Sequence, residues 1–394
     1  MIAELRREFN EKLYSPEKYA RFLAALDAAA GTHIEFRHNE TPVFLPRELV
    51  ETMCRSGQQM LRQAVAEPYR KISDRAVPPR YAVPDEAACP LYVQADFGLV
   101  RTETGALEPR LVEIQGFPSL YAYQPVMAET YRRAYGLDPS LASLLSGLDI
   151  ESYWSLLTLA IVGDHDPENV VLLEIDPERQ KTLCDFRITE QLTGVRAVNL
   201  REIEQEGRKL FYRRDGRRVP VERIYNRCIV DELDRMGVAA PFDWNANLDV
   251  EWAGHPNWYF RLSKFTIPFL KHAHVPETLF LDRFAHIPND LENWVLKPLY
   301  SFAGSGVAVG PTREQVEQVA NPADYILQRR MRWEPVIDTP EGPTQIEVRI
   351  MYLWFEGGDP QPVNTIIRTG RGKMMGVDFN KGLTWVGASA AFVV

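Results

Sequence analysis

Residues 293–309 read Asn-Trp-Val-Leu-Lys-Pro-Leu-Tyr-Ser-Phe-Ala-Gly-Ser-Gly-Val-Ala-Val, and the predicted fold depends on this stretch. Residues 294–296 favour a β-strand because they are aromatic or branched apolar residues. Pro298 ends that strand, since proline has no N–H group to donate to a neighbouring strand. The apolar residues Val307 and Val309 then resume the alternation of a strand. The stretch therefore predicts two strands joined by a glycine-containing loop.

The same stretch carries a candidate phosphate site. Lys297 stands at the end of the first strand, and Gly304 and Gly306 let the loop backbone approach a ligand closely. A lysine charge beside free backbone N–H groups suits a polyphosphate. The alternative is a plain β-hairpin whose lysine is solvated. Because the sequence has neither a G-x-x-x-x-G-K-[ST] motif nor the third glycine of a dinucleotide fingerprint, a nucleotide held here would lie between strands.

Bulk properties narrow the class of protein. A chain of 394 residues predicts about two or three domains. The formal net charge of −9 disfavours a nucleic-acid-binding protein. The four cysteines are scattered without a C-x-x-C pair, so we expect reduced, buried residues rather than disulfides or zinc ligands. The charged N-terminus lacks the features of a signal peptide and no long apolar run occurs, so we expect no membrane span and a cytoplasmic location.

The N-terminal part predicts helices. Ser15 is a candidate N-cap with proline following it, and Gly31 is a candidate helix stop. A second helix is predicted over residues 47–66, where apolar residues recur on one side. Residues 72–85 are rich in proline and predict a connecting loop.

A β-hairpin follows and delivers oxygen-bearing side chains. Residues 91–101 and 109–115 predict two strands, and residues 102–106 predict the turn between them. The hairpin carries Asp96, Glu113 and Gln115, of which the last two share one face by the strand period of two. Such oxygen donors suit a hard cation such as Mg²⁺. The alternative is the exposed polar face of an edge hairpin.

The middle of the chain predicts a small α/β unit. After a helical region over residues 125–160, the apolar run 170–174 is typical of a buried parallel strand. Further strands are predicted at 195–200 and in a hairpin whose turn is Asp215-Gly216. Tyr225, Asn226 and Arg227 follow at a strand end, the edge where α/β sheets bind ligands. Arg227 would suit a substrate carboxylate, and a surface salt bridge is the alternative.

The C-terminal part returns to antiparallel strands. Residues 345–354 alternate cleanly, with Glu347 and Arg349 on the face opposite the aliphatic residues. Residues 364–369 predict the partner strand and carry Arg368. Further elements are the segment around Lys264, a short helix at 312–320, a strand at 324–329 and a glycine-rich tail.

These motifs, taken in order, resemble a known superfamily. The order is Lys264, Val-Leu-Lys-Pro at 295–298 with its glycine loop, Tyr-Ile-Leu-Gln at 325–328, Glu-Val-Arg at 347–349 and Arg368. It resembles the ATP-grasp superfamily. The Asp96 strand and Leu-Val-Glu-Ile-Gln at 111–115 stand upstream instead of downstream, which is similar to the circularly permuted branch of eukaryotic-type glutathione synthetase and glutathionylspermidine synthase.

The resemblance implies an α/β (α+β) fold in which two antiparallel sheets sandwich ATP, with a small α/β substrate domain and N-terminal helices. The implied division is a helical region 1–85, a permuted magnesium-binding part 86–160, a substrate-binding domain 161–255 and a nucleotide-binding part 256–394. A homodimer is implied by analogy with the same branch.

The resemblance also assigns site residues. It implies ATP contacts, metal ligands, substrate contacts and catalytic arginines. The implied ATP contacts are Lys264, Lys297, Ser301, Gly304, Ser305, Gly306, Ile326, Leu327 and Gln328. The implied metal ligands are Asp96, Glu113 and Gln115, and the implied substrate contacts are Tyr225, Asn226 and Arg227. The implied catalytic arginines are Arg349 and Arg368. Arg368 would face the substrate carboxylate or the developing acyl phosphate. Where the family has a basic residue shortly after the Arg368 position this chain has Gly370, and Arg371 is the nearest replacement.

The implied activity is an ATP-dependent carboxylate–amine ligase that works through an acyl phosphate, with Mg²⁺ and small-molecule or peptide carboxylate and amine substrates. Two departures leave other functions open. Gln115 stands where the family usually has asparagine, and Leu299, Tyr300 and Ser301 stand where the permuted synthetases have an acidic residue. The alternatives are a catalytically altered nucleotide- or peptide-binding protein, a phosphotransferase with a hydroxyl acceptor, and an α/β scaffold without a nucleotide.

Overall fold

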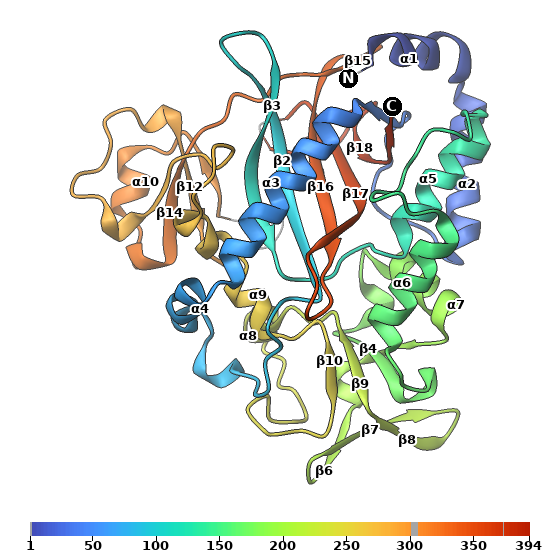
Figure 1. Ribbon diagram of the computed structural model, residues 1–394, viewed down its shortest axis with the longest axis vertical. Coiled ribbons are helices and arrows are strands. Elements are labelled where there is room, and N and C mark those ends of the chain that lie inside the picture. Colours follow the sequence, from blue (N-terminus) through green and yellow to red (C-terminus); the bar gives the residue numbers. More distant parts are fainter. Residues whose placement is uncertain (1, 301–305, 373) are drawn as a thin grey trace.

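The computed structural model describes residues 2–300, 306–372 and 374–394 as a mixed α/β protein (Figure 1). Its centre is an antiparallel sheet in the order β18 (Gly387–Ser389), β17 (Gln361–Gly370), β16 (Gly342–Leu353), β2 (Tyr92–Arg101) and β3 (Leu107–Gln115), with β15 (Ile337–Thr339) paired to β16. The strands predicted from alternation at 91–101, 109–115, 345–354 and 364–369 are all confirmed.

One face of this central sheet is apolar. Ile346, Val348 and Ile350 of β16 share a core with Ala95 and Phe97 of β2. Helix α3 (Arg47–Val65), the helix predicted at 47–66, packs on this face and crosses the sheet in Figure 1. Alternation along the strands leaves Glu347, Arg349 and their neighbours on the opposite face.

A second antiparallel sheet lies beside the first and holds the stretch 293–309. Its order is β11 (Thr278–Phe280), β14 (Tyr325–Arg329), β12 (Trp294–Pro298) and β13 (Ala308–Val309). The pairing of β12 with β13 confirms the predicted hairpin strands, and Pro298 is the last residue of β12. The short helix α10 (Arg313–Glu317) packs through Val316 against Leu296 and Leu327 of this sheet.

The middle of the chain forms the predicted parallel sheet. Its order is β10 (Glu251–Ala253), β9 (Arg223–Asn226), β4 (Val170–Glu174) and β5 (Arg196–Asn199). All five residues of β4 are buried, as expected for a central parallel strand. Helices α6 (Ile150–Val162) and α7 (Leu183–Thr193) accompany it, and β6 (Glu204–Glu206), β7 (Lys209–Arg214) and β8 (Arg217–Val221) form a meander. Asp215 and Gly216 make its turn with φ of 50° and 79°.

The N-terminal helices and the two chain ends lie together (Figure 1). In α2 (Pro16–Ala30), Ser15 accepts a hydrogen bond from the Lys18 N–H group and Gly31 closes the helix at φ 64°, as predicted. Strand β1 (Val43–Leu45) pairs in parallel with β19 (Ala391–Val393). The other α-helices of the described residues are α1 (Ala3–Glu8), α4 (Glu67–Ser73), α5 (Tyr123–Tyr135), α8 (Val230–Met236) and α9 (Asn257–Arg261).

Two expectations need correction. The helical region predicted at 125–160 is two helices, because Gly136 adopts φ 64° and ends α5, and α6 begins only after the Asp149 N-cap. The loop predicted at 72–85 contains the end of α4 and two single-turn 3₁₀ helices.

The four cysteines are free and buried, as expected. Within the described ranges, no helix has both the length and the apolar character needed to cross a membrane.

Candidate functional site

The candidate site begins with strand register on the polar face of the central sheet. Asp96 of β2 lies opposite Arg349 of β16 on one side and Glu113 of β3 on the other. Glu347 of β16 lies opposite Arg368 of β17. Because directly paired residues project to the same face, the sheet gathers these charged side chains although they are far apart in sequence.

Two arginines converge on Asp96. Arg349 donates from Nε to Oδ1 and from Nη2 to Oδ2 of Asp96, each at 2.6 Å, and from Nη1 to Gln94 Oε1 at 2.9 Å. Arg368 donates from Nη2 to Asp96 Oδ2 at 3.0 Å and also contacts Glu347. Asp96 is fully buried. The predicted catalytic arginines are therefore brought together on one carboxylate.

Two lysines that lie outside the central sheet, Lys264 and Lys297, reach residues of its strand β3. Lys264 opens a 3₁₀ helix capped by Ser263, and its Nζ lies 3.3 Å from Glu113 Oε2. Lys297, at the end of β12, donates to Gln328 Oε1 at 2.6 Å and to the carbonyl oxygen of Val112 at 3.2 Å. Since Val112 belongs to β3, Lys297 spans from the smaller sheet to the central sheet.

The electrostatics of the cluster reflect burial and the excess of cations. Burial raises the pKa of Glu113, but Lys264 first, then Arg349, Lys297 and Arg368, outweigh it and hold the pKa at about 2. Burial lowers the pKa of Lys297 to about 8. Burial and the nearby Asp96 raise the pKa of Glu347. Four cationic groups thus face three carboxylates, and the balance favours an anionic ligand.

The candidate nucleotide residues divide between two faces of the smaller sheet. Ile326 lies opposite Lys297 across the strands, and Gln328 shares their face by alternation. The side chain of Leu327 instead packs in the cluster of Leu296 and Val316. The Nε2 atom of Gln328 is buried and has no hydrogen-bond partner among the described residues. Gly306 adopts φ 73° beside Pro298. The predicted Ser301, Gly304 and Ser305 lie outside the described residues.

The fit of the predicted metal ligands is uneven. Glu113 and Gln115 lie on one face with their side chains in contact, and Glu113 stays ionised, which suits a hard cation. Asp96 fits less well, because it is fully buried and three arginine N–H groups occupy its two oxygens, whereas the Glu113 side chain is 18% exposed. Within the described residues, no group of three or more His, Cys, Asp or Glu side chains could hold a metal ion.

The predicted substrate residues lie at the end of β9. Arg227 is 2% exposed and pairs at 2.5 Å with Asp185, which also accepts the N–H groups of Leu120, Ala122 and Tyr123. The alternative of a surface salt bridge for Arg227 is therefore wrong, because the pair is buried. Tyr225 is buried against Tyr92, and Asn226 accepts from the Cys228 N–H group.

Arg371 does not replace the missing basic residue at position 370. It donates to Thr344 Oγ1 at 3.1 Å and to the Thr384 carbonyl at 2.8 Å. Thr344 lies on the face of β16 opposite Glu347, so this contact directs Arg371 away from Arg368. A Cβ atom at Gly370 would lie 2.8 Å from Asn380 Oδ1, so a side chain at position 370 would require Asn380 to shift.

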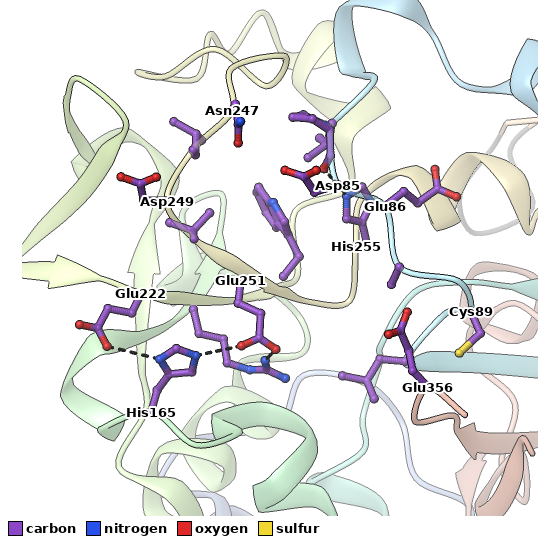
Figure 2. A pocket seen from close by; sticks show the side chains of 18 of the residues that line it. Asp85, Glu86, Cys89, His165, Glu222, Asn247, Asp249, Glu251, His255 and Glu356 are labelled. Carbon is purple, nitrogen blue, oxygen red and sulfur yellow. Dashed lines mark hydrogen bonds and ion pairs between the residues drawn. The ribbon is translucent and has the colours of Figure 1, made fainter. Parts of the chain in front are cut away.

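A separate cavity of about 880 Å³ lies near the edge of the parallel sheet, and none of the predicted site residues lines it (Figure 2). In Figure 2, His165 bridges Glu222 at 3.3 Å and Glu251 at 2.9 Å. Glu251 also contacts Arg223, and Asp249 pairs with Arg208. These carboxylates are therefore already engaged by cationic or imidazole groups of the chain.

Comparison with known proteins points to one fold. No protein-family model matches the sequence, and no curated protein matches it. Among solved structures, a glutathione synthetase-like effector (GSS30) from Globodera pallida in the apo form is similar, with a TM-score of 0.58. The match has 14% identity and covers 97% of this chain and 98% of that chain. At this identity the likeness concerns the fold alone, and the chain has a glutathione synthetase-like fold.

Proposed function

We propose that the protein is an ATP-dependent carboxylate–amine ligase. The observation that carries the proposal is the cluster of Lys264, Lys297, Arg349 and Arg368 between two antiparallel sheets, with Glu113 kept ionised among them. An anionic ligand would satisfy the excess positive charge. In an ATP-grasp enzyme of the permuted branch, that ligand is the polyphosphate of ATP.

The proposal gives each group a role. Lys264 and Lys297 bind phosphates, Arg368 faces the phosphoryl group or the acyl phosphate, and the strand 326–328 lies by the adenine. The loop that would cover the phosphates is assigned to residues 301–306, of which only Gly306 lies among the described residues. Glu113 and Gln115 would hold Mg²⁺, which neutralises phosphate charge when bound. Arg227 with its neighbours 225–226 would contribute to the substrate pocket. The division into parts 1–85, 86–160, 161–255 and 256–394 belongs to the same proposal.

The reaction needs little chemistry from the protein. A substrate carboxylate oxygen attacks the γ-phosphorus of ATP and ADP leaves, which gives an acyl phosphate. An amine then attacks the acyl carbon, an amide bond forms, and inorganic phosphate leaves with the proton lost by the amine. Both steps depend on positioning and on neutralising charge, which lysines and arginines supply.

A thermal-shift titration with Mg-ATP tests the nucleotide site. A ligand at a hundred times its dissociation constant stabilises the folded state by about 2.7 kcal/mol. We expect this shift in the wild type and its loss in Lys297→Ala, while the exposed Lys271→Ala serves as a matched control that keeps it. Absence of a shift in the wild type would refute the proposal. A positive result leads to screening of amino acids, peptides and polyamines as carboxylate and amine substrates by ADP release.

A catalytically altered binding protein is the second candidate. The carboxylates of Asp96, Glu113 and Glu347 already pair with the cations of the cluster, which favours a ligand-free state that is stable by itself. ATP binding without ADP release in the presence of any carboxylate and amine would support this candidate. A phosphotransferase would instead release ADP and form a phosphorylated product without an amide.

A further inference from the structure

The surroundings of Asp96 suit a partner of arginines better than a metal ligand. Its carboxylate is fully buried, and three N–H groups from two different strands point at it. Arg349 forms a parallel two-bond fork with both oxygens, the geometry that fixes a guanidinium group most firmly. Binding of a cation by Asp96 would displace these donors and leave the buried Arg349 without its carboxylate partner.

The two arginines differ in access to a ligand. The side chain of Arg349 is 10% exposed, and its three bonding nitrogens are all engaged by Asp96 and Gln94. The side chain of Arg368 is 34% exposed and uses Nη2 alone for Asp96 and Glu347. Arg368 therefore has N–H groups left for an anion, whereas Arg349 is committed to the sheet.

Strand register places these charged residues directly opposite one another in the central sheet. Asp96 faces Arg349 directly across β2 and β16, and Glu347 faces Arg368 directly across β16 and β17. Each charged pair is therefore fixed by backbone pairing on both sides. Arg368 is held at one nitrogen by two carboxylates, which fixes the direction of its guanidinium group.

We infer that Asp96, Glu347 and Arg349 are positioning residues that aim Arg368 at the phosphoryl group transferred from ATP, and that Asp96 is not a metal ligand. This inference rests on the proposed function. It predicts that loss of Asp96 weakens recognition of the γ-phosphate through Arg368, while the binding of the divalent cation continues to depend on Glu113.

The test compares the affinities for Mg-ATP and Mg-ADP by calorimetry. We expect Arg368→Ala, Asp96→Asn and Glu347→Gln each to lower the ratio of ATP to ADP affinity by about tenfold or more, the usual effect of a hydrogen bond to a charged group. Asp96→Asn combined with Arg368→Ala should lose no more than Arg368→Ala alone. Asp249→Asn, which removes a charge that pairs with the exposed Arg208, is the matched control and should keep the wild-type ratio.

A second measurement separates positioning from metal binding. Mn²⁺ binding to the nucleotide complex, followed by electron paramagnetic resonance, should weaken in Glu113→Gln and persist in Asp96→Asn. An unchanged ATP to ADP ratio in both Asp96→Asn and Glu347→Gln would overturn the inference, as would an equal loss of Mn²⁺ in Asp96→Asn. Glu347→Gln leaves Asp96 intact, so the test stands even when Asp96→Asn fails to fold. A wild type that binds neither nucleotide would overturn the proposed function itself.

Discussion

Lys297 is a buried ammonium group whose charge depends on pH near neutrality. Burial lowers its pKa to about 8, so the lysine loses its proton in the folded protein as the pH rises above that value. A phosphate ligand needs the charged form. We therefore expect the affinity for Mg-ATP to fall above pH 8, approaching about tenfold per pH unit for a single proton.

Calorimetric titrations between pH 7 and pH 9.5 measure this dependence. Lys297→Ala should bind more weakly at pH 7 and should lose most of the pH dependence, while Lys271→Ala should follow the wild type. If Lys297→Ala shows the same fall above pH 8 as the wild type, another group is responsible and the assignment to Lys297 fails.

At the scale of single residues, sequence reasoning found the charged groups but not their partners. Alternation correctly placed Glu347 and Arg349 on one face, because the strand period is a local property. It could not pair Arg349 with Asp96, since the two residues are 253 positions apart and their contact depends on which strands become neighbours. For the same reason the local context of Asp96 predicts a metal ligand and gives no sign of the two arginines that its strand register brings to it.

At the scale of elements, the packing of α3 on the central sheet depends on a glycine. A Cβ atom at Gly57 would lie 2.9 Å from Cζ of Tyr352, and closer still to its hydroxyl oxygen, which donates to the Cys54 carbonyl. Tyr352 is fully buried and cannot move away freely. We expect Gly57→Ala to lower the free energy of unfolding by about 1–3 kcal/mol through overpacking, despite the better helix propensity of alanine.

Urea denaturation of a double-mutant cycle checks this prediction. In the Gly57→Ala background, Tyr352→Phe removes the clashing hydroxyl and should cost less stability than it does in the wild type. Arg55→Ala, an exposed position of the same helix, should change stability little. Additive effects of the two substitutions would contradict the predicted clash.

Elements with strong local signals could be predicted from the sequence, but the strands that lie beside them in a sheet could not. The Ser15 cap, the Asp215-Gly216 turn and the β2–β3 hairpin are formed by residues close in the chain. The order of the central sheet is different, because β16 inserts between β2 and β17 after more than half of the chain has passed. Hydrophobic periodicity carries no information on such pairing between strands that are distant in the sequence.

At the scale of the whole molecule, the first and last parts of the chain are joined by strand pairing. Val43, Phe44 and Leu45 of β1 pair with residues 391–393 of β19, and the Val394 N–H group donates to the Leu45 carbonyl. Phe392 is fully buried, with its ring 6.2 Å from that of Phe44 and its face 5.2 Å from the guanidinium carbon of Arg132. This contact therefore ties the N-terminal helices and α5 to the end of the chain.

Phe392→Ala tests how cooperative the molecule is. Removal of a buried phenylalanine ring leaves a cavity and should lower the free energy of unfolding by about 3–5 kcal/mol. Since β1 and β19 join distant parts of the chain, we expect the loss to appear in the main unfolding transition, followed by urea denaturation with fluorescence and circular dichroism. Trp385 packs against Tyr14 near this junction, so its fluorescence reports on the junction. Trp244 packs against Trp252, so its fluorescence reports on the α/β unit. A variant in which the N-terminal helices unfold separately, while the rest keeps its wild-type midpoint, would show that the pairing joins two independent units rather than one cooperative structure.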